Sequence, residues 1–92
     1  MQNKNYLTRD FYLAAYIIAS GIELRSSFKH KGLTTFVFPE SNELQQLVRQ
    51  FYGLDALVNP VTYGNALRNL KSVIHAESKP NETYVKQPIT TN

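Results

Sequence analysis

The amino-acid sequence predicts a small α+β fold, with three helices packed on one face of an antiparallel sheet. Three observations point to this class. Residues 22–38 have the pattern of a β-hairpin, because apolar and polar residues alternate on both sides of a turn. Helix-type spacing occurs before and after the hairpin, over about residues 9–20, 42–52 and 60–76. The chain of 92 residues is long enough for one hydrophobic core and too short for two.

The first helix is expected to follow a short N-terminal strand at Tyr6-Leu7. Thr8 is the predicted N-cap of the helix at 9–20, and Gly21 is expected to end it. Residues 11–19 are apolar on nearly all sides of this helix. A helix with that pattern is buried on most sides, so it is either central in the fold or part of an oligomer interface.

The hairpin has a first strand over 22–29 and a return strand over 33–38, joined by a turn at 30–32. One side of the first strand carries Ile22, Leu24, Ser26 and Phe28. Its other side carries Glu23, Arg25, Ser27 and Lys29. The predicted core side of the return strand carries Thr34, Phe36 and Phe38. This alternation predicts that one face of the hairpin is buried and the other is exposed.

Two more helices are expected after the hairpin. Ser41 is the predicted N-cap of the helix at 42–52, which has a single apolar stripe at helical spacing. The apolar connector at 54–58 is either a loop or an edge strand. An edge strand there would allow a split β-α-β arrangement of the ferredoxin-like kind. Asn59, placed before a proline, is expected to begin the helix at 60–76.

The composition changes near the C-terminus. Residues 77–92 are rich in polar residues and proline, with two acids and two bases. We therefore expect one compact domain over residues 1–76 and a disordered tail over 77–92. The formal net charge of +3 then belongs to the compact domain.

The composition also argues against several protein classes. The chain has no cysteine, which excludes a disulfide framework and a thiolate zinc site. No apolar run approaches the roughly 20 residues that a bilayer-spanning helix needs. No secretory signal is apparent at the N-terminus. We therefore expect a cytoplasmic protein that is not associated with a membrane.

Motifs that would indicate an enzyme are missing from the sequence. The four glycines form neither a phosphate-binding loop nor a dinucleotide-binding fingerprint, and no nucleophile elbow occurs. The two histidines fall on different predicted elements, without a metal-binding spacing. The expectation is a binding protein that is not an enzyme, with no catalytic residues, no metal and no cofactor.

Basic side chains form two groups that contain no acid. The first group belongs to the hairpin and consists of Arg25, Lys29, His30 and Lys31. The second belongs to the last helix and consists of Arg68 and Lys71, with His75 one turn further. These groups predict contacts with the phosphate backbone of a nucleic acid, with DNA and RNA left open. The alternative is that they are ordinary solvated charges, which on a strand also discourage edge pairing.

Residues 31–38 partly match the octamer that characterises RNA-recognition motifs. The match includes Lys31, Gly32 and Phe38. The positions that should carry base-stacking aromatic rings hold Leu33 and Thr35 instead. We therefore do not assign the chain to that family.

The first helix also suggests association with another protein chain. Its surplus of apolar and tyrosine surface predicts a homodimer interface at Tyr12, Tyr16 and Ile17. The alternative function for the chain is therefore a protein–protein interaction module that acts through this helix.

The order of residues also resembles a small family of prokaryotic and viral proteins that is known only as a domain of unknown function. The segments that carry the resemblance are 8–15, Gly21, 35–38, 43–44, 47–48, Phe51 and 66–71. The resemblance spans about residues 6–75. It implies a compact intracellular single-domain protein associated with phages or mobile elements, in which the interaction module above would be an adaptor or inhibitor of a host protein. It implies no activity, cofactor or site residue.

Overall fold

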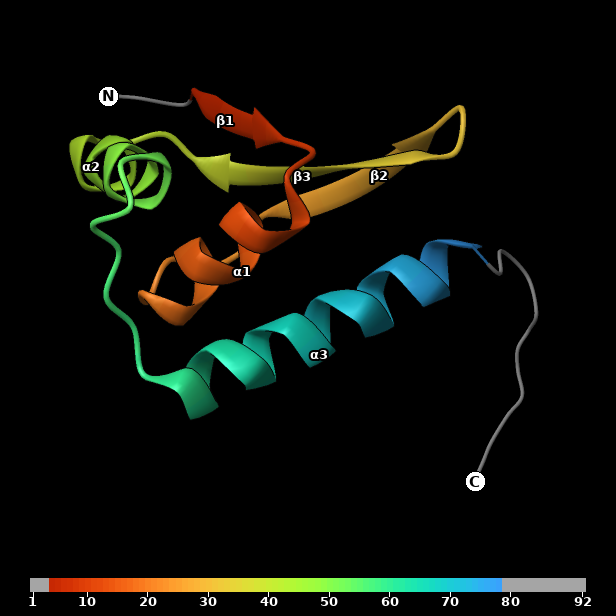
Figure 1. Ribbon diagram of the computed structural model, residues 1–92. Coiled ribbons are helices and arrows are strands. Elements are labelled where there is room, and N and C mark those ends of the chain that lie inside the picture. The colour runs from red at the N-terminus through yellow and green to blue at the C-terminus, as the bar shows by residue number, and fades with distance from the viewer. Residues whose placement is uncertain (1–3, 79–92) are drawn as a thin grey trace.

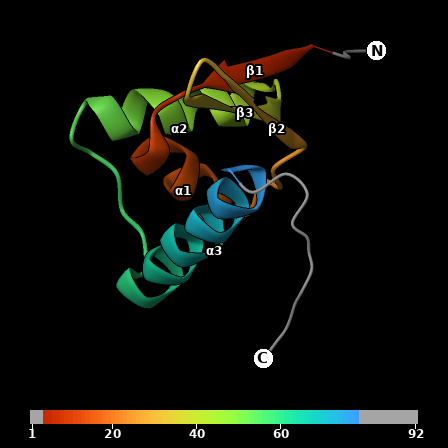
Figure 2. The same ribbon diagram turned by 90° about the vertical axis from the view of Figure 1, so that its right-hand side faces the viewer.

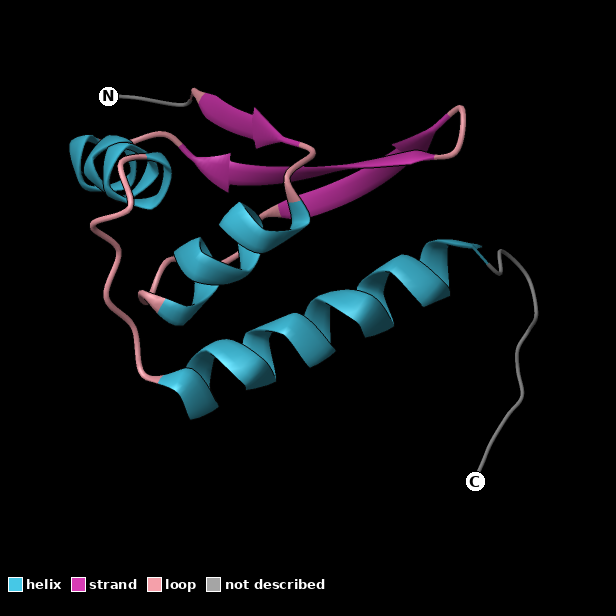
Figure 3. Cartoon of the chain, in the orientation of Figure 1, coloured by secondary structure: helices cyan, strands magenta, loops and turns pink. Residues whose placement is uncertain are grey.

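The computed structural model describes residues 4–78, which form three strands and three helices (Figures 1 and 3). The elements in chain order are β1 Asn5–Thr8, α1 Phe11–Ala19, β2 Ser26–His30, β3 Leu33–Pro39, α2 Asn42–Tyr52 and α3 Pro60–Ser78. The predicted α+β fold class is therefore confirmed. No helix in this part of the chain is long and apolar enough to cross a bilayer.

The three strands form one antiparallel sheet in the order β1-β3-β2. The last strand along the chain is thus the central one, and it pairs with both of the others. Its inner face carries Phe36 and Phe38, which are fully buried against the helices. The β2–β3 turn has two residues, Lys31 and Gly32, with φ values of 52° and 81°. Two residues with positive φ are what a type I′ hairpin turn requires.

Helix α1 is the central layer of the molecule. It lies between the sheet and α3, and α2 packs against it at one end of the sheet (Figures 1 and 2). Five consecutive residues of α1, from Leu13 to Ile17, are buried. This position explains why the helix is apolar on nearly all sides, because neighbours within the chain cover it. Of the two explanations that the sequence allowed, the central helix is the one that the fold adopts.

The N-cap of α1 is Asp10, so the prediction of Thr8 is wrong. The Asp10 Oδ1 atom accepts hydrogen bonds from the backbone N–H groups of Tyr12 and Leu13, both at 3.1 Å. Thr8 is the last residue of β1, and its Oγ1 accepts from the Asp10 N–H. The helix therefore begins at Phe11, two residues later than predicted, because the strand ends so close to it.

Strand β2 is shorter than predicted because a β-bulge precedes it. Ser26 is in register with Val37, and the backbone N–H of Arg25 also donates to the Val37 carbonyl at 2.7 Å. Two consecutive residues therefore oppose Val37, which shifts the alternation of side chains by one position. As a result, Leu24 packs against the core whereas Phe28 lies on the opposite, outer face of the sheet.

The connector between α2 and α3 is a loop, so the split β-α-β arrangement is not formed (Figure 3). The predicted caps on either side of it are confirmed. The Ser41 Oγ accepts from the Leu44 N–H at 3.0 Å, and the Asn59 Oδ1 accepts from the Val61 N–H at 2.9 Å. Helix α3 ends at Ser78, two residues beyond the predicted end. Most of the predicted tail, residues 79–92, lies outside the described residues.

Candidate functional site

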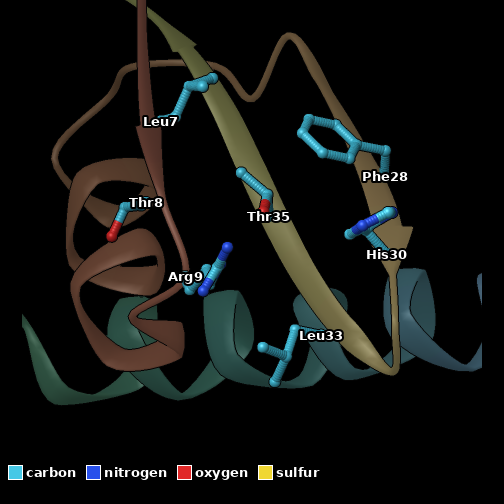
Figure 4. Close-up of a pocket in the computed structure, with 7 residues that line it drawn as sticks. All are labelled: Leu7, Thr8, Arg9, Phe28, His30, Leu33 and Thr35. Carbon is cyan, nitrogen blue, oxygen red and sulfur yellow. The ribbon is translucent and has the colours of Figure 1, made fainter.

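The outer face of the sheet contains a hollow of about 260 Å³ (Figure 4). All three strands and the short segment after β1 contribute to it. Its lining residues are Leu7, Thr8, Arg9, Phe28, His30, Leu33 and Thr35.

The strand register brings these side chains together. Thr35 of the central strand is in register with Phe28 of β2, so the two side chains share a face. Leu7 of β1 is in register with Val37, two residues from Thr35, and therefore shares that face as well. Thr35 is smaller than its neighbours on the outer strands. It forms the floor between a β1 wall and a β2 wall (Figure 4).

The hollow combines apolar and basic groups. Phe28 is 47% exposed, and Leu7 and Leu33 are similarly accessible. Arg9 stands on the β1 side and His30 on the β2 side, and no acid lines the hollow (Figure 4). An arginine and an exposed aromatic ring on opposite sides of a hollow can together hold a planar, electron-rich or anionic group between them.

Arg25 extends this surface toward the other end of the sheet. Its Nη1 donates to the Asn5 Oδ1 on β1 at 2.6 Å, although β3 lies between their two strands. The side chain therefore crosses Val37 on the outer face. This bridge accounts for the low exposure of Val37, 6%, on a face with no helix over it.

Asp10 and Glu40, which follow β1 and β3 in the chain, accept hydrogen bonds from residues of α2. The Asp10 Oδ2 accepts from the Tyr52 hydroxyl at 2.6 Å, and the Glu40 Oε2 accepts from the Gln45 Nε2 at 2.5 Å. The Asp10 hydrogen bond is the main cause that raises the pKa of Tyr52 to about 12. Burial and the nearby Asp10 charge also raise the pKa of Tyr63.

Tyr6 lies on the opposite face of β1 from the hollow. Its pKa is raised by burial first, and then by the charges of Glu40 and Asp10. These tyrosines stay protonated near neutral pH and supply no anion beside the hollow.

The floor residue Thr35 is unusual because it is a buried polar side chain. It is 7% exposed, and its hydroxyl has no hydrogen-bond partner among residues 4–78. Buried hydroxyl groups in proteins are nearly always hydrogen-bonded. A hydroxyl without a protein partner at the floor of an open hollow is therefore available to water or to a ligand atom.

Comparison with known protein families identifies the family of this chain. The model of the domain of unknown function DUF5659 matches residues 3–76. The chain belongs to the DUF5659 family. Searches of curated proteins and of solved structures returned no match. Every residue that lines the hollow lies within the DUF5659 domain.

In the folded DUF5659 domain, the four basic residues predicted for the hairpin do not share one face of the sheet. Arg25 and His30 are on the outer face, and Lys31 is in the turn beside it. Lys29 is in register with Thr34 and shares the opposite face. The four groups therefore do not form one continuous strip, because the alternation along β2 divides them.

The second predicted group is on another side of the DUF5659 domain. Arg68 and Lys71 are exposed on α3, and α1 lies between α3 and the sheet (Figure 2). Arg68 donates to the Asn65 side chain of its own helix. The two basic groups therefore cannot form a single contact surface with the hollow.

The predicted interface residues have different environments. Tyr16 and Ile17 are buried within the chain's own core and have almost no surface for a second chain. Tyr12 is exposed, and its carbonyl oxygen accepts from the Tyr63 hydroxyl at 3.1 Å. Of the three predicted interface residues, Tyr12 is therefore the one with surface available for association.

Several lining residues were missed from the sequence, chiefly Arg9, Phe28, Leu33 and Thr35. Leu33 and Thr35, which hold the octamer positions where base-stacking rings would be needed, both line the hollow. The aromatic ring comes from Phe28 on the neighbouring strand instead. Within residues 4–78, no cluster of histidines and acids that could hold a metal ion occurs.

Proposed function

We propose that this protein binds single-stranded nucleic acid on the outer face of its sheet. The observation that carries the proposal is a solvent-accessible face on which Phe28 lies among Arg9, Arg25 and His30, with no acid lining the hollow. Lys31 in the adjacent turn adds a further positive charge at its edge.

The chemistry of the face favours an unpaired strand over a duplex. A base can stack on an aromatic ring only when it is not already stacked inside a helix, and such stacking contributes about 1–3 kcal/mol per base. Arginine side chains near the ring bind the phosphates that precede and follow that base. Arg68 and Lys71, on the far side of α1, are not part of this proposal.

Fluorescence anisotropy with labelled single-stranded DNA, single-stranded RNA and duplex DNA tests the proposal. We expect single strands to bind more tightly than the duplex, with an affinity that falls between about 50 and 200 mM salt. Phe28→Leu should weaken single-strand binding by about 5- to 150-fold, since it removes the stacking ring. Arg9→Gln should reduce the salt slope by about 0.7 for one lost phosphate contact.

Lys71→Gln is the matched control, because it removes one positive charge from the side that does not face the hollow. It should leave the affinity and the salt slope unchanged. If Lys71→Gln and Arg9→Gln lower the affinity equally, the binding depends on net charge and the proposed surface is wrong.

A second candidate function is a protein–protein interaction module at the α2–α3 connector. The observation that favours it is the exposure of three apolar side chains, Leu54, Leu57 and Val61, on this loop and the first turn of α3. Sedimentation equilibrium detects self-association through this surface and also through the homodimer interface expected on α1. Loss of association in Leu57→Ser, but not in Lys71→Gln, would assign it to the connector, whereas a wild-type monomer at all concentrations would exclude both.

A further inference from the structure

We infer that the hollow holds one unpaired base and that the Thr35 hydroxyl determines which base is preferred. This inference rests on the proposed function, because it names the part of the nucleic acid that enters the hollow. The structural basis is a buried hydroxyl at the floor of a hollow that has an aromatic ring and a guanidinium at its sides (Figure 4).

The first argument is the unsatisfied hydroxyl of Thr35. It has no hydrogen-bond partner among residues 4–78, and it lines a hollow that is open to solvent. Val37, two positions further on the same face of the same strand, is equally buried and has no polar group. The Thr35 hydroxyl therefore makes no hydrogen bond within the described part of the fold, and its donor and acceptor are available to a ligand atom that enters the hollow.

The second argument is the size of the hollow. Its volume of about 260 Å³ is below the range of about 300–1,000 Å³ that is typical of pockets for drug-sized molecules. This volume suits one ring system and not a stack of two. Phe28 and His30 on the β2 side, and Arg9 on the β1 side, are planar groups that suit a flat ligand (Figure 4).

The third argument concerns which base the polar groups favour. An arginine side chain only donates hydrogen bonds, whereas a threonine hydroxyl both donates and accepts. Arg9 together with Thr35 therefore favours a ligand edge that is rich in acceptors. The carbonyl oxygens of thymine, uracil and guanine provide such an edge, whereas adenine has no carbonyl. We expect thymine or uracil to bind more tightly than adenine.

The test is a competition between short DNA strands of equal length that contain only thymine, only adenine, or thymine with one abasic position. Anisotropy is measured with the wild-type chain, Thr35→Val and Thr35→Ser. The wild type should prefer the thymine strand, and Thr35→Val should reduce this preference by about 2- to 10-fold, as expected for one hydrogen bond. Thr35→Ser should retain the preference because it keeps the hydroxyl. The salt slope should be the same in all three proteins, since no phosphate contact changes.

The outcomes separate this inference from the proposed function. If the strands bind but Thr35→Val leaves the thymine-to-adenine ratio unchanged, the inference is overturned and the proposed function stands. The same holds if the wild type shows no preference among the strands. If no strand binds at about 50 mM salt, the proposed function fails and the inference fails with it. Thermal unfolding of Thr35→Val confirms that the variant is folded, and valine is well accommodated in strands.

Discussion

The Tyr52 hydroxyl at the end of α2 donates a 2.6 Å hydrogen bond to Oδ2 of Asp10, the residue that caps α1. The other oxygen of the same carboxylate, Oδ1, accepts the two N–H groups of the first turn of α1. One side chain therefore both begins the central helix and holds the end of another helix against it. Arg9, the residue before Asp10, lines the hollow on the outer face, whereas the Asp10 carboxylate is directed to α1 and α2.

Replacement of Asp10 by alanine should destabilise the fold by about 1–2 kcal/mol, because it removes an N-cap and the acceptor for Tyr52. Asp10→Asn should cost less, since asparagine is an equally good N-cap and its side-chain oxygen can still accept. Urea unfolding, monitored by circular dichroism, measures both variants. Equal losses in the two variants would show that the charge of Asp10 is important and the cap is not.

The hydrogen bond between Tyr52 and Asp10 should also make the stability of the fold fall at alkaline pH. The pKa of Tyr52 is about 12 in the folded chain, above the ordinary tyrosine value of 10. A tyrosine with a raised pKa in the folded state stabilises that state fully below pH 10, and this contribution is lost as pH rises from about 10 to 12. Tyrosinate absorbance during a pH titration should lose its step near pH 12 in Tyr52→Phe, whereas the contributions of Tyr6 and Tyr63, whose pKa values are also raised, should remain. A step near pH 12 that persists in this variant would contradict the assignment to Tyr52.

The end of α2 should be stabilised by a glycine at position 54. The Leu54 φ is 65°, and the Asp55 N–H bonds to the Gln50 carbonyl, so Leu54 takes the left-handed position that glycine usually takes at a helix end. Its side chain is 91% exposed and contributes no packing. Leu54→Gly should therefore raise the free energy of unfolding by about 1 kcal/mol. Leu54→Ala, which keeps the Cβ atom, is the control and should give no such gain.

The preceding glycine should not tolerate a side chain. A Cβ atom at Gly53 would lie 2.9 Å from the backbone carbonyl oxygen of Arg49, which cannot move without distorting the helix. Gly53→Ala is thus expected to lower the melting temperature, in contrast to Leu54→Gly. If both variants were stabilised, the assignment of the two positions at this helix end would be incorrect.

Lys31 in the β2–β3 turn has a positive φ, as Leu54 does at the end of α2. It has a φ of 52° without being glycine or asparagine. Lys31→Asn should stabilise the chain by about 0.5 kcal/mol, because asparagine adopts this conformation more easily. Lys31→Ala removes the same charge without this benefit, so it should not stabilise. If Lys31→Asn and Lys31→Ala raised the melting temperature equally, the gain would come from the loss of the lysine charge.

Features that depend on neighbouring residues along the chain could be predicted from the sequence. Ser41 and Asn59 cap their helices as expected, since an N-cap bonds to groups two or three residues away. Phe36 and Phe38 point to the core because the side chains of a strand alternate. Thr8 was mistaken for the N-cap because two good caps lie two residues apart and only the end of β1 distinguishes them.

The candidate site was harder to predict because it depends on contacts between distant residues. The bulge opposite Val37 reverses the side on which Phe28 lies, and it exists only when β2 pairs with β3. Arg9 lines the same hollow as Thr35 only because β1 lies beside β3 in the sheet. Neither relationship leaves a spacing pattern in the sequence. The basic residues of the hairpin were identified, but their division between two faces depends on the register.

The strand order has a consequence for how the chain folds during synthesis. β1 is translated before β3, so it has no pairing partner in the sheet until β3, at its centre, has been made. Helix α1 likewise lacks its cover on one side until α3, which follows it in the chain, has been translated. A nascent chain that stops between α1 and α3 therefore exposes apolar surface of α1 and would be a substrate for chaperones and proteases.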